Sequence, residues 1–446
     1  MTESTSPNER FKLDNVDEPN LYRDMFPYTT LPQVAFDNES PPSMAPAKRF
    51  LISDTTFRDG QQARPPYAIQ QVVDLFTLLN KLDGGAGLIT HSEFFLYSDR
   101  DRKAVEQCLS LGFEFPQVTG WIRAVAADFK LVKEMKLKET GILTSCSDYH
   151  IFLKLKKTRK QVMAQYMTIV KDAISEGITP RCHFEDITRA DFYGFVLPFA
   201  AELNDLRIES GVNIKLRLCD TMGFAVPWAN AALPRSVPKL VAGIVNEVGY
   251  PGELLEWHGH NDFHKVLINP ATAWLHGCAT CNGSLLGIGE RTGNTPIEAM
   301  VIEAGQLSGQ DSRINYEVIT EIAEYYRRQI GYPIPGNYPI VGEEFNITRA
   351  GIHADGLLKC EEIYSAFDTG NILNTPPGVA ITDKSGAAGI KHWILSHYEL
   401  DVPKDDSRLQ ALRLTVDTEY DAGRTTAISN EEMHRWFSLA FDRPAT

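Results

Sequence analysis

The chain has 446 residues, of which 43% are hydrophobic and 23% charged, a composition ordinary for a globular protein with a large core. Its formal net charge of −14 at pH 7 argues against a nucleic-acid-binding or membrane-surface protein, because both classes need basic patches. No stretch approaches the roughly 20 apolar residues that span a bilayer, and residues 1–19 lack the features of a secretory signal. The seven cysteines are scattered and odd in number, which does not suit a disulfide framework. We therefore expect a cytoplasmic protein with no nucleic-acid or membrane partner.

Short apolar strands alternate with longer helical patterns from residue 48 to residue 310. Before this region, residues 1–47 are rich in Pro, Asn, Asp and Glu, which predicts an arm on the surface. The alternation indicates an α/β fold, a (β/α)8 TIM barrel. A doubly wound open sheet is the alternative, but no nucleotide-binding fingerprint follows the first strand. The predicted strands span 50–53, 87–93, 115–122, 141–146, 178–184, 214–219, 254–258 and 280–287. The predicted helices span 68–82, 100–111, 126–135, a segment opened by the capping box 158–161, 191–209, 234–248, 265–276 and 296–307.

Small helices replace this alternation after residue 310. We expect a helical linker and subdomain at 311–400 and a helical tail at 401–446. The predicted helices lie at 315–330, 353–367 and 386–397, with two more between 406 and 440, the second opened by a capping box from Ser429 to Glu432.

Polar side chains gather where the predicted strands end, the edge at which TIM barrels place their active sites. Surface polar residues would be scattered, so this clustering is the main argument from the residues for an active site. The residues are Arg58 and Asp59, Glu93, Glu185 and Asp186, Asp220 and Thr221, His258 and His260, and Asn294.

His258 and His260 predict a metal site. Side chains two residues apart on a strand point the same way, so both imidazoles can reach one ion. Asp59 supplies an anionic oxygen, and Asn294 can add an amide oxygen. Such a set suits Mn, Co, Mg, Zn or Fe and does not choose among them. Arg58 beside Asp59 can hold a carboxylate in a forked contact.

The segment 286–294 is a glycine-rich loop after a strand, so its backbone N–H groups can approach an anion, and Arg291 adds positive charge. An ordinary turn is the alternative. From its pattern alone, His353 suits a helix cap or a core. The other histidines are interpreted as structural, among them His150, His183, His264 and His276.

Several motifs together resemble one family. They are Arg58-Asp59-Gly60, Glu93, Cys219-Asp-Thr-Met-Gly223, His258-Gly-His260-Asn-Asp262, Gly289-Glu-Arg-Thr-Gly-Asn294 and Gly351-Ile-His-Ala-Asp355. The chain is similar to the metal-dependent Claisen-condensing barrel enzymes from about residue 49 to residue 395. That family includes isopropylmalate, homocitrate and citramalate synthases, with hydroxymethylglutaryl-CoA lyase as a cousin.

Within the family, other segments look closest to the branch of Re-face-specific citrate synthases, with phosphinomethylmalate synthases as siblings. These segments are 20–27, Gln61, 92–97, 182–191 and 344–351. The resemblance implies condensation of acetyl-CoA with oxaloacetate to citrate, a divalent metal (Mn²⁺ or Co²⁺ first, then Mg²⁺ or Zn²⁺) and a homodimer.

The resemblance also implies roles for single residues. Asp59, His258, His260 and Asn294 match the metal ligands, and Arg58 matches the arginine that polarises the keto oxygen. Glu185 and His353 match acid/base residues, with His353 expected from the partner subunit. The residues assigned to substrate binding are Gln62, Glu93, Thr221 and Arg291.

Two departures from the family pattern stand out. The tyrosine expected ahead of residues 385–389 is not evident, and Tyr364 is a weak match for it. The chain also ends too early for a leucine-sensing domain, so we expect no such feedback control.

Two other functions remain as rivals. Retro-aldol cleavage is disfavoured because the lyase's glycine-rich loop carries a cysteine, and residues 287–294 have none. A scaffold barrel without catalysis is disfavoured by the complete set of polar groups. The choice of 2-oxo acid stays open among oxaloacetate, 2-oxoisovalerate and 2-oxoglutarate.

Overall fold

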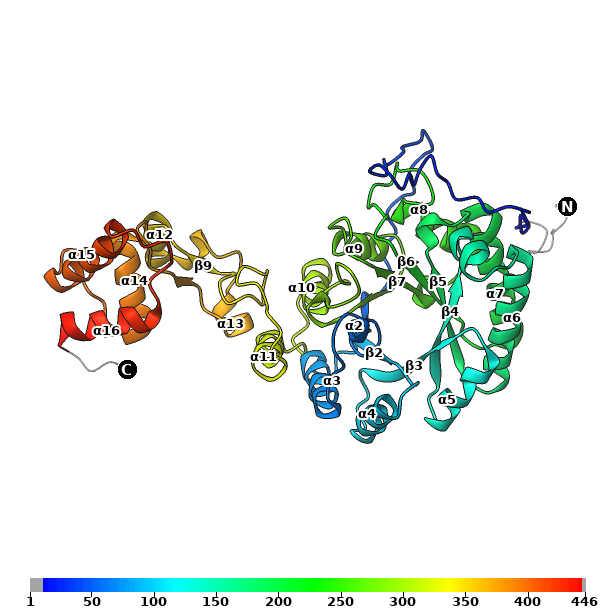
Figure 1. Ribbon diagram of the computed structural model, residues 1–446, viewed down its shortest axis with the longest axis horizontal. Coiled ribbons are helices and arrows are strands. Elements are labelled where there is room, and N and C mark those ends of the chain that lie inside the picture. Colours follow the sequence, from blue (N-terminus) through cyan, green and yellow to red (C-terminus); the bar gives the residue numbers. More distant parts are fainter. Residues whose placement is uncertain (1–10, 443–446) are drawn as a thin grey trace. The chain divides into compact units, whose positions relative to one another are not determined.

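A computed structural model describes residues 11–442 of the chain (Figure 1). It consists of two compact units, Met1–Asn315 and Tyr316–Thr446. Residues 1–10 of the predicted arm and residues 443–446 of the predicted tail lie outside the described residues. Among the described residues, no helix is both long and apolar enough to cross a membrane.

The first unit contains eight parallel strands that close into a barrel in chain order (Figure 1). The last strand pairs with the first, through Leu51 opposite Thr280 and Asp54 opposite Gly283. The predicted TIM barrel is therefore confirmed, and the open-sheet alternative is excluded. The strands are β1 (Leu51–Asp54), β2 (Ile89–Phe94), β3 (Gln117–Arg123), β4 (Glu139–Ser145), β5 (Thr179–Glu185), β6 (Lys215–Asp220), β7 (Leu255–Gly259) and β8 (Thr280–Gly283).

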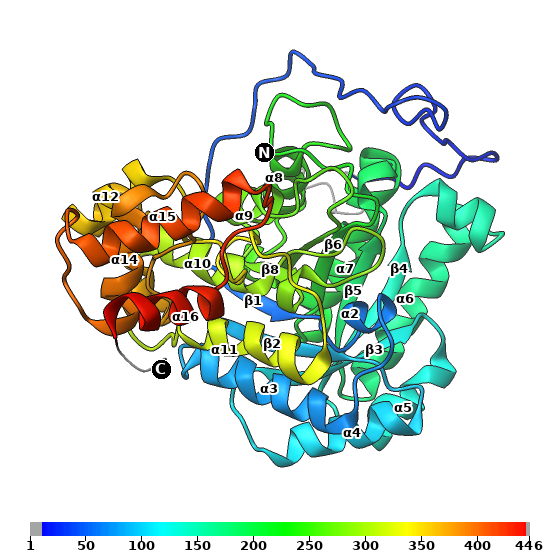
Figure 2. The ribbon, with the colours of Figure 1, turned by 60° about the vertical axis from the view of Figure 1, so that its left-hand side comes forward.

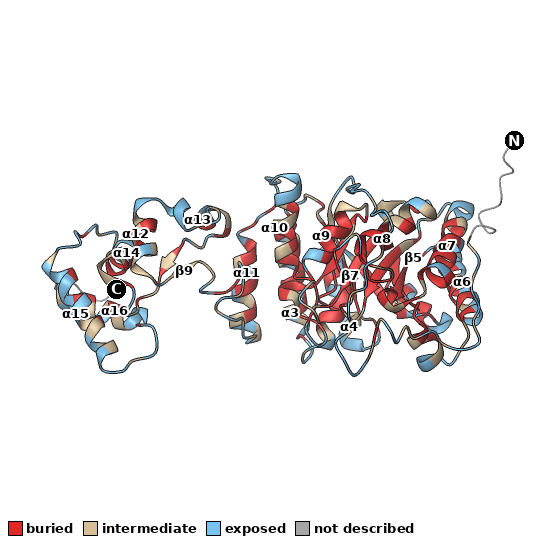
Figure 3. Ribbon diagram, turned by 90° about the horizontal axis from the view of Figure 1, so that it is seen from above, coloured by how far each residue is buried: buried red, intermediate tan, exposed pale blue. Residues whose placement is uncertain are grey.

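Helices surround the barrel with their buried residues inward, as the mainly red inner and pale blue outer parts of the ribbon in Figure 3 show. In α3, for example, Val72, Leu75, Phe76 and Leu79 are buried at the spacing of one helix face. The helices are α2 (Asp59–Gln62), α3 (Ile69–Asp83), α4 (Asp99–Ser110), α5 (Phe129–Glu134), α6 (Arg159–Ser175), α7 (Leu197–Ser210), α8 (Val237–Ala242), α9 (Ile268–Leu275) and α10 (Ile297–Ser308).

One predicted strand is too long. The strand expected at 280–287 ends at Gly283, because the following backbone N–H groups bond to other segments instead of a neighbouring strand. Ser284 donates to the Thr295 carbonyl at 2.9 Å. Leu285 donates to the Thr56 hydroxyl at 2.9 Å, and Leu286 donates to Glu298 at 3.0 Å. Leu286 also has a φ of 56°, which breaks the extended conformation.

The strands are apolar outside and charged inside. In β6, Leu216 and Leu218 are buried towards the helices, and the alternate residues Lys215 and Arg217 project into the barrel. A TIM-barrel interior is more often filled by branched apolar side chains. Here it has to be held together by ion pairs.

Arg217 lies at the centre of this interior and is fully buried. Its guanidinium is 2.9 Å from Glu93 and 3.0 Å from Glu256. Arg181, also buried, pairs with Glu139 and lies 3.2 Å from Glu256 and 3.4 Å from Glu93. Each buried charge therefore has opposite charges around it, which offsets the cost of removing it from water.

The N-terminal arm, residues 11–47, contains no helix or strand and runs along the outside of the barrel (Figure 2). It is anchored at several points. Asp14 N–H donates to the Gly194 carbonyl at 2.8 Å, and Lys239 pairs with Asp37 at 2.6 Å. Ala45 N–H donates to the Leu275 carbonyl at 3.0 Å.

The second unit is mainly helical and has its own core around Trp393, whose indole N–H donates to Asn430 at 2.8 Å. The predicted helix 353–367 is wrong in its bounds: α12 ends at Lys359 and a short 3-10 turn follows. The predicted capping box from Ser429 to Glu432 is present. The elements are α11 (Val318–Tyr325), β9 (Ile347–Thr348), α12 (Gly351–Lys359), α13 (Thr369–Leu373), β10 (Gly378–Val379), α14 (Gly386–Tyr398), α15 (Ser407–Asp421) and α16 (Asn430–Phe441).

Arg217→Met tests the ionic interior. It leaves Glu93 and Glu256 without their shared guanidinium, so we expect a loss of about 3–5 kcal/mol in unfolding free energy. Arg207→Met, on the partly exposed face of α7, is the matched control and should change stability by no more than about 0.5 kcal/mol. Urea denaturation of both variants measures the difference. Equal stability of the two variants would contradict the account.

Candidate active site

The predicted metal ligands come from three strand ends. Asp59 opens α2 directly after β1, His258 lies in β7, and His260 follows that strand. Asn294 lies at the end of the glycine-rich loop, where its backbone forms an isolated bridge with His260. The loop is held in place by the Asn294 N–H, which donates to the Gly287 carbonyl at 2.8 Å.

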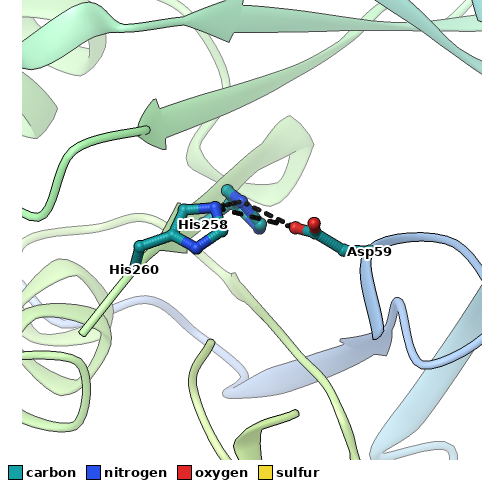
Figure 4. A group of neighbouring side chains, drawn as sticks. All are labelled: Asp59, His258 and His260. Atoms are coloured by element: carbon teal, nitrogen blue, oxygen red, sulfur yellow. Dashed lines mark hydrogen bonds and ion pairs between the residues drawn. The ribbon is translucent and has the colours of Figure 1, made fainter. Parts of the chain in front are cut away.

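The side chains of Asp59, His258 and His260 converge on one point (Figure 4). Asp59 Oδ2 lies 3.3 Å from His258 Nε2 and 3.8 Å from His260 Nε2. The two Nε2 atoms are 3.3 Å apart, and all three residues are buried. The structure therefore brings together three of the four predicted ligands within one metal's reach.

Polar atoms without partners support a cation at this point. Asp59 Oδ2 and both amide atoms of Asn294 are buried and make no hydrogen bond. His258 Nδ1 lies 2.7 Å from Asn282 Oδ1, so Nδ1 carries the proton and Nε2 presents its lone pair. Asp59 Oδ2, Asn294 Oδ1 and His258 Nε2 can each offer a lone pair, and a buried set of oxygen and nitrogen ligands of this kind fits a divalent cation.

The protonation states also fit metal binding, which needs a carboxylate and neutral imidazoles. Burial raises the pKa of Asp59, but the positive charge of Arg58, joined in acid by that of the protonated histidines, outweighs it, so the pKa falls below its ordinary value. Burial lowers the pKa of His258 to about 3 and also lowers that of His260. At neutral pH the cluster is therefore one carboxylate with two neutral rings.

Arg58 lies beside the cluster, held by Glu93. Its Nε is 2.9 Å from Glu93 Oε2, and its Nη1 is 3.7 Å from Asp59 Oδ1. Glu93 is fully buried and also contacts Arg217 and His183. Burial raises the pKa of Glu93, but Arg217, His183 and Arg58 reverse that effect and hold it well below its usual range. Glu93 thus fixes the orientation of Arg58.

The glycine-rich loop ties three strand ends together through Arg291. The Arg291 guanidinium pairs with Asp262 at 2.9 Å and donates to the Thr221 carbonyl at 2.6 Å. Close packing explains one of the glycines. A Cβ added at Gly289 would lie 2.6 Å from Asn294 Oδ1. A side chain there would displace the predicted fourth ligand.

A second polar cluster lies at the ends of β4 and β5. Glu185 accepts from the Ser145 hydroxyl and lies 3.1 Å from His150 Nδ1. Asp186 N–H donates to the Thr221 hydroxyl at 2.9 Å. Burial raises the pKa of Glu185, but the His150 contact and Lys154 lower it to about 2. Glu185 is therefore an ionised carboxylate at the barrel mouth.

Two other predicted residues are not members of these clusters. Gln62 is exposed at the end of α2. His353 belongs to the second unit, where its ring packs 4.4 Å from the ring of Tyr364. Tyr364, the weak match for the family's tyrosine, therefore lies next to the predicted acid/base histidine.

Sequence reasoning missed Arg217, Glu256 and Asn282, which support the site from inside the barrel, and it treated His150 as structural. The signal was present in the alternation: Glu256, His258 and His260 share one strand face, as do Lys215 and Arg217. Charged residues on the inner face of apolar strands need buried partners, and their spacing alone does not name those partners.

Comparison with known proteins agrees with this geometry. A family model described as HMGL-like matches residues 49–325. The citrate (Re)-synthase of Syntrophus aciditrophicus is 56% identical over 428 residues, 95% of this chain and 68% of that protein. The citrate (Re)-synthase of Clostridium kluyveri is 51% identical over 95% of this chain and 94% of that protein. The 2-phosphinomethylmalate synthase of Streptomyces hygroscopicus is 34% identical over 96% and 98%, respectively.

Solved structures show the same fold. The HMG-CoA lyase of Bacillus subtilis superposes with a TM-score of 0.51 at 19% identity, covering 66% of this chain and 97% of that chain. With the motifs at the strand ends and the identities of 51–56%, the family expected from the sequence is confirmed. The chain belongs to the HMGL-like family and, within it, groups with the citrate (Re)-synthases.

Proposed function

We propose that this protein condenses acetyl-CoA with oxaloacetate on the Re face of the keto group and hydrolyses the thioester, giving citrate and CoA. The two relatives at 51–56% identity carry the name of this activity. The observation that carries the proposal is the buried convergence of Asp59, His258 and His260 on one point beside the Arg58 guanidinium. Asp59 Oδ2 and the amide atoms of Asn294 make no hydrogen bond there.

Asp59, His258, His260 and Asn294 would hold a divalent cation, with Mn²⁺ or Co²⁺ expected first. Bound there, such a cation supplies Lewis-acid polarisation of a keto group and a fixed point for a 2-oxo acid. Arg58 lies close enough to share the negative charge that develops on the keto oxygen during attack. Glu93 keeps Arg58 in place, so we propose that it acts through Arg58. Thr221, Arg291 and Gln62 remain candidates for direct substrate contact.

The acid/base steps need residues from both units. In the proposed reaction His353 removes a proton from the acetyl methyl group, and the resulting carbanion adds to the keto carbon. The alkoxide formed on the keto oxygen then takes up a proton to give the hydroxyl of the product. Glu185 assists proton transfer at the barrel mouth, and water then cleaves the thioester to release the thiol. We propose that His353 comes from the partner subunit of a homodimer. Tyr364, in ring contact with His353, is the candidate for the missing tyrosine.

A second candidate is condensation of acetyl-CoA with a phosphinate analogue of oxaloacetate. The 2-phosphinomethylmalate synthase at 34% identity over nearly the whole of both chains supports it. The two activities share the chemistry at the keto carbon and differ at the far end of the 2-oxo acid. A panel of substrates therefore separates them.

The direct test is thiol release from acetyl-CoA with a panel of 2-oxo acids. We expect oxaloacetate to give the highest kcat/KM, exhaustive chelation to abolish the activity, and Mn²⁺ or Co²⁺ to restore it. Faster release with the phosphinate analogue would favour the second candidate. No release with any 2-oxo acid in the presence of metal would contradict both and favour a scaffold.

The face of attack can be read from labelled citrate. Citrate made from ¹³C-acetyl-CoA is cleaved with a citrate lyase that removes the arm added by Si-specific synthases. Attack on the Re face predicts that the label stays in the oxaloacetate fragment. Label in the acetyl fragment would exclude Re-face attack while leaving the condensation itself intact.

Asn282→Ala tests the orientation of the metal ligand. It removes the oxygen that fixes the His258 tautomer, so we expect metal affinity to fall about 10- to 100-fold. Asn204→Ala, a buried asparagine on α7, is the matched control and should bind metal like the unmodified protein. Isothermal titration calorimetry with Mn²⁺ measures the metal affinity of both variants. Unchanged affinity in Asn282→Ala would rule out the proposed orientation.

A further inference from the structure

A π-helical segment after β4, Tyr149–Lys154, carries two side chains to the carboxylate of Glu185. His150 Nδ1 lies 3.1 Å from Glu185 Oε2, and Lys154 Nζ lies 3.4 Å from Oε1. His150 Nε2 also lies 3.7 Å from Asp186 Oδ2. One imidazole therefore bridges the two neighbouring carboxylates at the end of β5.

The N-terminal arm holds this π-helical segment from the outside. Asn20 N–H donates to Asp148 at 2.8 Å, and the Tyr149 hydroxyl donates to the Leu21 carbonyl at 2.7 Å. These two contacts hold the two residues that immediately precede His150. The arm thus reaches the barrel mouth through residues 20 and 21.

The same tyrosine links the arm to the end of β5. The Arg189 guanidinium lies 4.0 Å from the centre of the Tyr149 ring, a cation–π contact, and pairs with Asp186 at 2.9 Å. Arg23 of the arm lies over the same ring at 5.4 Å. The arm, the π-helical segment and the end of β5 therefore form one connected cluster.

We propose that His150 is a positioning residue for Glu185 and that the N-terminal arm keeps His150 in place. The inference rests on the proposed function, in which Glu185 takes part in proton transfer. A carboxylate held at Oε2 by His150 and the Ser145 hydroxyl has one orientation and stays ionised. Without His150, Glu185 keeps Ser145 and the exposed Lys154, and its rotamer is less restricted.

Several titratable groups surround Glu185. His150 and Lys154 come from the π-helical segment, and Asp186 follows Glu185 in the chain. Cys146, Tyr166 and Cys219 also interact with it electrostatically, from the end of β4, from α6 and from β6. Burial raises the pKa of Glu185, and the His150 hydrogen bond is the first of the contacts that bring it down to about 2.

His150→Ala and His150→Asn test the proposal in the full-length, metal-loaded protein. Alanine removes the donor, so we expect kcat to fall about 10-fold or more with less than about 3-fold change in either KM. Because loss of the donor raises the pKa of Glu185, the acid limb of the kcat profile should move to higher pH. Asparagine places an amide N–H near the position of Nδ1. His150→Asn should therefore recover much of kcat, and the acid limb of its kcat profile should lie near that of the unmodified protein. A kcat and pH profile of His150→Ala equal to those of the unmodified protein would overturn the proposal.

Two further variants distinguish failure of the role assigned to Glu185 from failure of the inference about His150. Glu185→Gln should abolish turnover, and if it retains full kcat, the assigned role of Glu185 fails along with this inference. If Glu185→Gln is inactive and His150→Ala is fully active, only the inference fails. His276→Ala, a histidine bonded to its own helix, is the control and should leave kcat unchanged.

Tyr149→Phe tests the part played by the arm. It removes the hydroxyl that bonds to Leu21 and keeps the ring that packs on Arg189. As in His150→Ala, we expect kcat to fall and the acid limb of the kcat profile to move to higher pH, but the fall in kcat should be only a few-fold. Tyr193→Phe, an exposed tyrosine, is the matched control. Equal kcat and pH profile in the two tyrosine variants would exclude the arm from the positioning of His150.

Discussion

The buried ionic interior of the barrel is the constraint on which the rest of the site depends. A continuous chain of contacts runs from the predicted metal ligands to the Arg58 guanidinium. His258 bonds to Asn282, which donates to Ser53 at 2.8 Å, and Ser53 bonds to Glu256. The chain then continues through Arg217 and Glu93 to Arg58. No member can be moved without leaving a buried charge or polar group unpaired, which is costly.

This arrangement accounts for a preorganised site. The side chains that would bind a metal and the guanidinium that would share negative charge are fixed by one network before a substrate arrives. Dipoles and charges that need not reorganise during a reaction are the most effective stabilisers of developing charge. The network also gives a local positive group to a chain whose formal net charge is −14.

Much of the fold follows from the sequence because its physical signals are local. Alternation of apolar strands and helices predicted all eight strands of the barrel. Polar residues at the ends of six of these strands predicted the edge that carries the candidate site. The cluster of Asp59, His258 and His260 also followed, since His258 and His260 share a strand face and Asp59 follows β1 at the same edge of the barrel. The end of β8 was misjudged because it depends on side chains from other segments, Thr56 and Glu298.

The partners of buried charges could not be predicted, because they come from strands far apart in the chain. Glu93 was expected to meet the substrate, and the structure surrounds it with Arg58, Arg181, Arg217 and His183. His150 was treated as structural because nothing in its own segment shows that Glu185 lies beside it. Closure of the barrel creates these contacts, and periodicity along one strand carries no information about the strand opposite.

The central claim is that one divalent cation is bound by Asp59 and the two imidazoles. Pulsed electron paramagnetic resonance of the protein loaded with one equivalent of Mn²⁺, prepared with ¹⁵N-labelled histidine, tests it most directly. The account predicts hyperfine coupling from two histidine nitrogens, reduced to one in His260→Ala. Tightly bound Mn²⁺ without any histidine coupling, or unchanged coupling in that variant, would contradict it.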